Sequence, residues 1–426
     1  MKRALQVFLT VLFVLCASLP APAQKFLPKT IQFKGDPEYT NQELLAAAGL
    51  KQGVVLTVAE MKDHFDRLSQ TGVFESVVYK FDGVDLVFTL MPAALLYPIR
   101  LENLPLIPGK ELDAALHERF PLYHGKVPAE GGLLEDVRQA LEGMLAAQGM
   151  KATVMATPFG PLNAHKVTAI NFAVVAPPVR VGAIHLEGVS PALMAKVEFV
   201  ANRSVGAPFD TGNSGRNLEH AFESFYTDEG YAAVKVHAAR AGEPVVADAA
   251  IDIPFSVTVE EGRLYKLGSI HLPPDALVPQ AEIDKAIGSN AQGPAKGLAL
   301  RIVWAQIASR YKSKGYLDCV VTPHPAFDEA SGIVNYTVEL EPGPVYRLAV
   351  VKFENVSDEL RVRLMRIWQM LPGDPFNESY VANFILRVQK EDPGLQLTLA
   401  AVKVTYDVRA DPQTHEVNCV IRLEKR

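Results

Sequence analysis

The strongest constraint on the fold is an internal repeat. A glycine stands between a helical pattern and a strand pattern five times along the chain, with a period of about 80 residues. A second glycine precedes each of these by about 20 residues, and the apolar residues between the two have helical spacing. Such a repeat predicts a row of similar modules, not one large core. The glycine pairs are Gly53 and Gly72, Gly125 and Gly149, Gly206 and Gly230, Gly293 and Gly315, and Gly373 and Gly394.

The first repeat shows how each glycine pair encloses a helix. Thr57 has Glu60 three residues later, which is the pattern of a capping box. Gly72 suits the left-handed position that ends a helix. We expect the apolar stripe of this helix to be Val58, Met61, Phe65 and Leu68.

The remaining elements of a repeat are strands and one shorter helix. Residues 333–340 alternate between apolar and polar, and 328–332 supply a turn before them, as in a half-buried hairpin. An apolar strand opens each repeat and a short helix follows it, as at 41–48. Each module is therefore predicted to run strand, helix, helix, strand, strand. We expect an α+β fold in which two helices cover a three-stranded mixed sheet. Pro254 falls inside a predicted central strand, where we expect a bulge or a late strand start.

Very short joints rich in proline and glycine separate the modules, as at 91–92 and 341–343. Such joints predict a semi-rigid linear array of about five modules. The expected boundaries are 28–92, 96–177, 179–262, 263–343 and 344–426.

The N-terminus has the pattern of a secretory signal peptide, residues 1–23. Lys2 and Arg3 precede an apolar run at 4–19, and the small-residue site 21–23 follows. The run is shorter than a membrane span requires, so we favour cleavage over a retained anchor. A lipidated Cys16 is disfavoured because large residues precede it. The whole chain has a formal charge of −6, so removing these two cations leaves −8. This acidic balance argues against a nucleic-acid partner.

The order of elements, with a glycine and an aromatic residue after the second helix, resembles the polypeptide-transport-associated (POTRA) domain. The residues that carry the resemblance most strongly are 311–325 and 332–356, followed by 225–238, 373–381 and 68–81. The second module, 96–177, is the weakest match. Five such domains behind a signal peptide resemble the periplasmic part of the BamA family of outer-membrane protein assembly factors. Members of that family continue into a β-barrel, whereas only three residues follow the last predicted strand at 416–423.

The resemblance implies a periplasmic scaffold that binds polypeptides at exposed sheet edges. The expected partners are unfolded or nascent outer-membrane proteins, and a separately encoded β-barrel or assembly subunits. An extended segment adds to an edge strand through backbone hydrogen bonds, which suits a receptor for many clients. By resemblance the exposed edge is the strand after the second helix. The candidate residues are Val77, Val78, Tyr79, Val234, Lys235, Val236, Cys319, Val320, Val321, Val402 and Val404.

No pattern in the sequence indicates catalysis, a cofactor, a metal or a small-molecule substrate. The motifs of zinc proteases, α/β-hydrolases and phosphate-binding loops are missing from the sequence. The segment 212–215 approaches a nucleophile elbow but is expected to be a loop and helix cap. No two histidines are expected to share a face at metal-ligand spacing. Cys319 and Cys419 fall in different modules, so we expect free thiols. The alternatives are an envelope adaptor held by an uncleaved N-terminal anchor, and an enzyme with an unrecognised site.

Overall fold

The computed structural model describes residues 25–36, 38–161, 166–247, 249–288, 293–392, 394–395 and 402–425. The predicted signal peptide lies outside these residues. The chain divides into two compact units: Met1–Glu187, Ala201–Leu218 and Ala238–Val257 form one, and Gly188–Val200, Glu219–His237 and Thr258–Arg426 form the other. A sheet of three or four strands occurs in each of the five predicted repeats. We call these repeats modules 1 to 5; their exact domain boundaries, and their linear arrangement, stay predictions.

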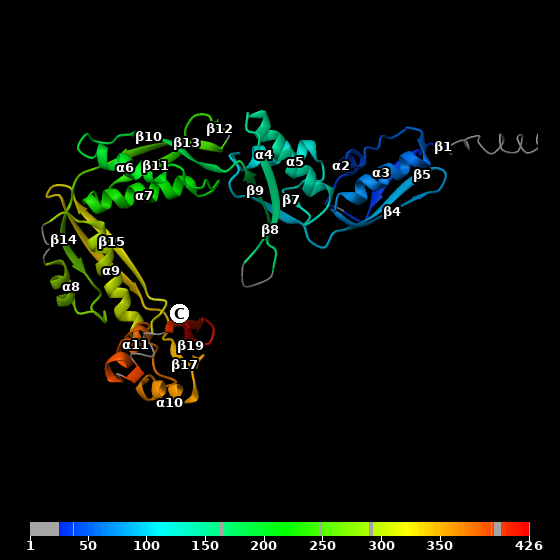
Figure 1. The fold of residues 1–426 in the computed structure, drawn as a ribbon. Coiled ribbons are helices and arrows are strands. Elements are labelled where there is room, and N and C mark those ends of the chain that lie inside the picture. The colour runs from blue at the N-terminus through cyan, green and yellow to red at the C-terminus, as the bar shows by residue number, and fades with distance from the viewer. Residues whose placement is uncertain are drawn as a thin grey trace, which may run out of the picture. The chain divides into compact units, whose positions relative to one another are not determined.

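Module 1 has the predicted order of elements (Figure 1). Its sheet has the strand order β2-β5-β4, in which β2 is parallel to β5 and β4 is antiparallel to it. A separate two-residue pairing joins β1 (Lys25–Phe26) to β3 (Leu56–Thr57). The elements of module 1 are β2 (Thr30–Lys34), α2 (Asn41–Ala48), α3 (Val58–Gln70), β4 (Phe74–Phe81) and β5 (Asp85–Pro92).

Modules 4 and 5 repeat this topology, with the strand orders β14-β16-β15 and β17-β19-β18. In both, the opening strand is parallel to the last strand and the middle strand of the sequence is antiparallel to it. Module 4 consists of β14 (Lys266–His271), α8 (Gln280–Ile287), α9 (Gly297–Lys312), β15 (Val320–Asp328) and β16 (Ile333–Glu341). Module 5 consists of β17 (Arg347–Glu354), α10 (Asp358–Ile367), α11 (Tyr380–Glu391), β18 (Val402–Asp411) and β19 (Glu416–Lys425).

Modules 2 and 3 each add one short strand. Module 2 has the order β7-β6-β9-β8, and in module 3 the path β10-β13-β11 carries β12 as a further partner of β13. Module 2 consists of β6 (Tyr97–Leu101), α4 (Lys110–Arg119), β7 (Lys126–Val127), α5 (Gly132–Ala147), β8 (Thr153–Phe159) and β9 (Ala169–Ala176). Module 3 consists of β10 (Val179–Glu187), α6 (Met194–Ser204), α7 (Ser214–Glu229), β11 (Lys235–Arg240), β12 (Val245–Ala247) and β13 (Ala250–Glu260).

Pro254 lies inside β13, and the expected late start of that strand is wrong. The strand begins at Ala250 because its first residues pair with β12, with Ala247 opposite Ala250 and Val245 opposite Asp252. This small hairpin forms the strand before the chain reaches the proline. The Pro254 carbonyl accepts a hydrogen bond from the Ala241 N–H at 2.9 Å.

Local signals in the sequence explain the helix ends. Thr57 and Glu60 form the predicted capping box at the start of α3, and Gly72 has a φ of +77° after its end. The segment before α7 is a helix cap, as predicted, because the Asp210 carboxylate accepts from the N–H groups of Gly212 and Asn213. The predicted stripe of α3 is wrong at Val58, the first residue of the helix, which is 54% exposed.

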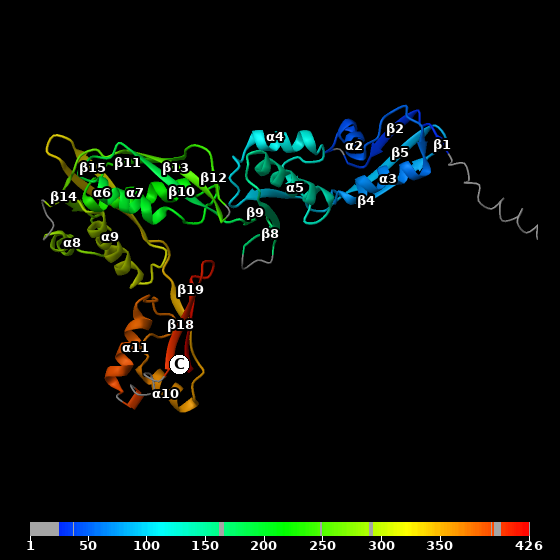
Figure 2. The ribbon, with the colours of Figure 1, turned by 45° about the horizontal axis from the view of Figure 1, so that its top comes forward.

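In modules 4 and 5 the buried core residues come from both the helices and the sheet, and the ribbon shows the helices beside one face of the sheet (Figure 2). In β16, Val334, Tyr336 and Val338 are buried while Thr337 and Glu339 between and beside them are exposed, as the alternation predicts. The fold class is therefore the predicted α+β. Among the described residues, no helix is both long and apolar enough to span a membrane.

Candidate polypeptide-binding edges

In modules 2 to 5 the chain itself covers part of the opening strand. In module 5 the segment between the two helices runs beside β17, where the Leu348 N–H donates to the Asp374 carbonyl at 2.9 Å and the Gly373 N–H donates to the Leu348 carbonyl at 2.7 Å. In module 4 the Leu267 N–H donates to the Gly293 carbonyl at 2.9 Å. In module 3 the Val181 N–H donates to the Ala207 carbonyl at 2.9 Å, and the Val181 carbonyl accepts from the Gly206 N–H at 2.8 Å. In module 2, β7 pairs with β6. Because this edge is partly covered, an added strand would have to meet the other edge of the sheet, which is the strand after the second helix.

The strands β4, β8, β11, β15 and β18 each stand at an edge of their sheet, as the sequence resemblance implied. In an antiparallel edge strand, alternate residues hydrogen-bond to the neighbouring strand, and those between them point their N–H and C=O groups outward. The phase of this alternation decides which backbone groups an incoming segment meets. Hairpin geometry and prolines fix the phase in four modules.

In module 4 two prolines fix the phase and also weaken the edge. Pro323 and Pro325 lie opposite Val338 and Tyr336 of β16. A proline cannot donate to the neighbouring strand, so these two positions face outward and lack the N–H that an added strand needs. The edge of β15 is therefore blunted over its centre.

The hairpin of module 5 has the same geometry as that of module 4. Four residues connect Asp328 to Ile333, with the Gly332 N–H donating to the Asp328 carbonyl at 2.8 Å. Four residues also connect Asp411 to Glu416, and the His415 N–H donates to the Asp411 carbonyl at 2.9 Å. Counting back from this shared turn, Tyr406 and Val408 of β18 take the places of the two prolines in β15. The outward-facing residues of β18 are therefore Val402, Val404, Tyr406, Val408 and Ala410.

In module 1 a shorter turn sets the phase. The Asp82 N–H donates to the Asp85 carbonyl at 3.3 Å, so this pair is hydrogen-bonded and Phe81, opposite Leu86, is not. The outward-facing residues of β4 are therefore Val77, Tyr79 and Phe81. No hydrogen bond from another described side chain reaches their backbone groups, so we call the edges of β4 and β18 the open edges.

In module 2 side chains of α5 occupy the edge. The Glu142 carboxylate accepts from the Val154 N–H at 2.8 Å, and Arg138 donates to the Val154 carbonyl at 3.2 Å. Arg138 also pairs with Glu142, their nearest atoms being 2.5 Å apart. Pro158, in the same outward phase as Val154, removes a further donor. The edge of β8 is therefore closed by its own module.

The predicted edge residues divide according to this phase. Val77, Tyr79, Val402 and Val404 face outward in the open edges, whereas Val78 is bonded inward to β5 although its side chain is 61% exposed. Val320 and Val321 lie in the blunted β15. The assignments of Val234 and Cys319 to strands are wrong, because their N–H groups close turns onto Tyr231 and Tyr316 after the second helices. Lys235 and Val236 lie in β11, where Lys235 forms an ion pair with Glu260 at 3.4 Å.

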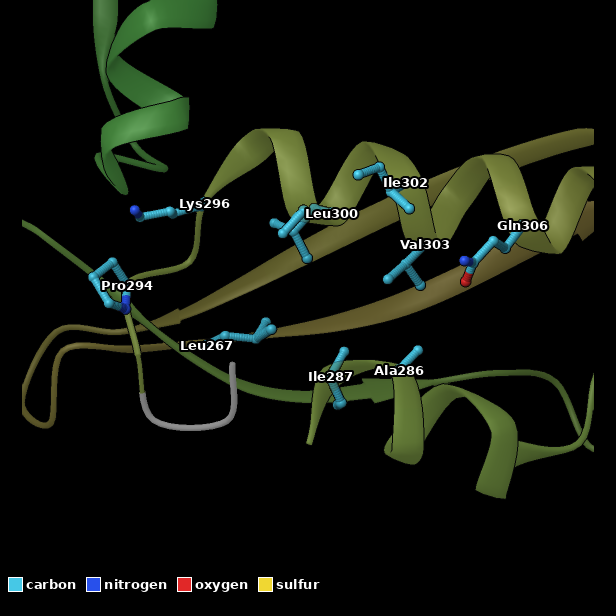
Figure 3. Close-up of a pocket in the computed structure, with 10 residues that line it drawn as sticks. Leu267, Ala286, Ile287, Pro294, Lys296, Leu300, Ile302, Val303 and Gln306 are labelled. Atoms are coloured by element: carbon cyan, nitrogen blue, oxygen red, sulfur yellow. The ribbon is translucent and has the colours of Figure 1, made fainter. Parts of the chain in front are cut away.

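Module 4 also has a small apolar cavity beside its covered edge (Figure 3). Its volume is about 210 Å³. Leu300 and Val303 extend from α9 toward Ile287 and Ala286 on α8, and Leu267 of β14 lies between the helices (Figure 3). The charged end of Lys296 and the amide of Gln306 stand at its ends. The cavity could hold one apolar side chain, and among the described residues that line it Lys296 is the one charged group and has no acidic partner there.

One group of titratable side chains is not indicated by the sequence. Glu43, His117 and His124 converge, and their potential ligand atoms all lie within 4.8 Å of one another. The expectation that no two histidines meet at metal-ligand spacing is therefore wrong. The two histidines both lie in module 2, His117 on α4 and His124 beyond the end of that helix, so helical spacing does not predict their contact, and Glu43 joins them from α2 of module 1. Cys319 and Cys419 are free, as expected; Cys419 is buried, and burial raises its pKa to about 11.

Comparison with known proteins adds only structural likeness. No family model matches the sequence, and no curated protein matches it significantly. The third to fifth POTRA domains of BamA from Haemophilus influenzae share 16% identity, cover 58% of this chain and 96% of that chain, and give a TM-score of 0.39.

Two cyanobacterial structures are also similar. The N-terminal domain of Omp85 from Thermosynechococcus elongatus shares 19% identity, with 59% and 98% of the two chains covered and a TM-score of 0.22. POTRA domains 1 to 3 of Omp85 from Anabaena share 18% identity, with 58% and 95% covered and a TM-score of 0.24. In its repeated strand–helix–helix–strand–strand modules, the chain resembles tandem POTRA-domain proteins of the BamA and Omp85 kind.

Proposed function

We propose that this chain is a polypeptide-binding scaffold of the periplasm, acting in outer-membrane protein assembly or transport. The observation that supports the proposal is the pair of open edges, β4 and β18. The edge opposite β18 is partly covered, and the edge β8 of module 2, which follows module 1, is closed. The role is the one that the sequence resemblance to POTRA domains implies, and the similar Omp85 fragment from Anabaena belongs to a periplasmic domain. The ligand we propose is an extended segment of an outer-membrane polypeptide.

The open edges suit a ligand whose sequence varies. Outward N–H and C=O groups recur at every second residue, so an added strand gains backbone hydrogen bonds regardless of its side chains. Exposed apolar groups lie on the same strands: Tyr406 is 51% exposed and Tyr79 is 37% exposed. Strands that span a membrane barrel alternate apolar and polar residues over about ten residues, which matches the length and alternation of β18.

The decisive test removes one outward N–H without removing the strand. Tyr406→Pro places a proline five residues before the end of β18, where β15 naturally carries Pro323 five residues before its own end. The matched control is Tyr406→Ala, which removes the same side chain and keeps the N–H. The corresponding pair in module 1 is Tyr79→Pro and Tyr79→Ala.

Binding is measured on the full chain with a fluorescent peptide of alternating apolar and polar residues, about ten residues long. We expect Tyr79→Pro with Tyr406→Pro to weaken binding at least about tenfold relative to the double alanine variant, because a lost hydrogen bond and a ring clash together exceed about 1.4 kcal/mol. Equal affinities for the two double variants would refute docking at these edges. Far-ultraviolet circular dichroism checks that both variants keep their sheets.

A further inference from the structure

The cluster of Glu43, His117 and His124 joins module 1 to module 2, both within the first compact unit. Glu43 lies on α2, His117 on α4, and His124 on the turn that follows α4. The Glu43 Oε1 atom is 2.9 Å from His124 Nε2 and 3.7 Å from His117 Nε2. The imidazole rings of the two histidines have centroids 5.2 Å apart. All three ligand atoms therefore point to one small volume.

Further hydrogen bonds hold two of these side chains in place. The Glu43 Oε2 atom accepts from the N–H and the hydroxyl of Thr40, both at 2.7 Å, which leaves Oε1 directed at the histidines. His117 Nδ1 is 2.9 Å from the Tyr123 carbonyl, so it carries the proton and the lone pair of Nε2 faces Glu43. Tyr123 is fully buried and donates its hydroxyl to Asp113 at 2.8 Å. A carbonyl behind a histidine is the usual support of a metal ligand.

We propose that this cluster binds one divalent transition-metal ion, with zinc as the favoured ion. The ligands are Glu43 Oε1, His117 Nε2 and His124 Nε2, and a water molecule completes a tetrahedral site. Ligand atoms of such a site stand about 3.3 Å apart. The two separations from Glu43 Oε1, 2.9 and 3.7 Å, bracket that value. The two histidine ligand atoms lie within 4.8 Å of each other, so side-chain rotations would bring all three to one ion. A neutral His124 then carries its proton on Nδ1, and the ion replaces the proton between His124 and Glu43.

Two imidazoles and one carboxylate favour zinc over magnesium or calcium, which prefer oxygen ligands. The bound ion would connect α2 to α4 and so fix the joint between modules 1 and 2. The site is distinct from the open edges, so its presence neither requires nor excludes polypeptide binding.

The test measures zinc binding to the untagged full chain by competition with a chromophoric chelator. We expect one zinc ion per chain, and an affinity at least about 100-fold weaker in His117→Asn and in His124→Asn. The control is His324→Asn, because His324 pairs with Glu339 at 2.9 Å in an isolated histidine–carboxylate pair and is in no metal-competent group of the described residues. This variant should bind zinc as the parent chain does.

Cobalt supplies a second readout that does not depend on affinity alone. Cobalt(II) in a tetrahedral nitrogen and oxygen site gives an intense visible absorption, which the parent chain should show and the two site variants should lack. The proposal is overturned if His117→Asn and His124→Asn bind zinc like the parent, or if His324→Asn weakens binding equally, since either result means adventitious binding at surface histidines. Circular dichroism of each variant confirms that a loss of binding is not a loss of fold.

Discussion

Gly72 offers a sharp test of whether the joints between modules are tightly packed. It follows α3 with a φ of +77°, and Gly149 follows α5 of module 2 with a φ of +80°. A Cβ at Gly72 would lie 2.4 Å from the Glu130 carbonyl oxygen and 3.2 Å from the Gly131 Cα, whereas a Cβ at Gly149 would meet nothing within 4 Å. The two glycines thus share a backbone conformation and differ in their surroundings.

The expected magnitudes follow from this difference. Alanine in the left-handed region costs about 1–2 kcal/mol, and both substitutions carry that cost. Gly72→Ala also forces backbone apart, which adds about 1–3 kcal/mol of overpacking. Because the obstacle is main chain of module 2, no side-chain rotation relieves it. The Leu133 N–H, which donates to the Thr71 carbonyl at 3.0 Å, would be displaced as well.

Hydrogen exchange of the full chain measures this cost locally, which is preferable because several modules need not unfold in one step. We expect amides of α3 in Gly72→Ala to lose about 5- to 150-fold more protection than amides of α5 lose in Gly149→Ala, the equivalent of about 1–3 kcal/mol. Equal losses in the two variants would show that the joint yields freely and would refute the reasoning.

Three further predictions use other parts of the chain. Replacing Pro323 and Pro325 by alanine should restore two outward N–H donors to β15 and create peptide binding in module 4. Binding is measured by fluorescence anisotropy in a chain whose open edges carry Tyr79→Pro and Tyr406→Pro. No gain in binding would mean that the prolines do not blunt this edge. Although partial burial opposes it, hydrogen bonds from Thr40 and His124 lower the pKa of Glu43 to about 2, so its contribution to stability is present above pH 4.5 and is lost as pH falls toward 2. Acid unfolding followed by circular dichroism should therefore show a stability difference between the parent and Glu43→Gln that shrinks over this window, and a constant difference would contradict the assignment. Cys319 is half-buried, whereas Cys419 is fully buried with a pKa of about 11. Iodoacetamide should therefore alkylate Cys319 first, as mapped by peptide mass spectrometry. Equal labelling of the two thiols in the folded chain would argue against the core of module 5.

The elements themselves can be predicted from the sequence because their signals are local. Thr57 and Glu60 predict a helix start, and the alternation of apolar and polar residues at 333–340 predicts a half-buried strand. The helix expected at 41–48 has the same bounds as α2. Such patterns act within a few residues, so tertiary structure has little opportunity to override them.

The apolar–polar periodicity of a strand does not predict which of its N–H groups face outward, although the prolines of β15 are a partial sequence signal. Periodicity tells which side chains face the core, but the direction of each N–H depends on the length of the turn. Pro323 and Pro325, two residues apart in a strand, could have indicated an outward phase and a blunted edge. Val154 gives no such signal, because Arg138 and Glu142 reach it from a helix earlier in the chain.

The contact of Glu43 with His117 and His124 cannot be predicted from the spacing of these residues in the sequence. His124 and Glu43 are 81 residues apart, about one period of the repeat, and meet only because modules 1 and 2 pack against each other. A contact of this kind depends on the orientation of one module on the next. The close crossing of Gly72 with Gly131 sets that approach, since a Cβ on Gly131 would lie only 2.8 Å from the Gly72 Cα.

The combination of open and blunted edges in one chain balances polypeptide binding against self-association. A sheet edge that accepts many clients through backbone bonds also accepts a second copy of the same chain. If every module kept an open edge, each molecule would offer many sites for such self-association. Pro323 and Pro325 remove donors in module 4, and Arg138 and Glu142 occupy the Val154 backbone in module 2, so fewer strands offer free backbone groups to an added segment. On this reasoning the residues that close β8 and β15 matter for solubility, and removing them should promote self-association even where client binding increases.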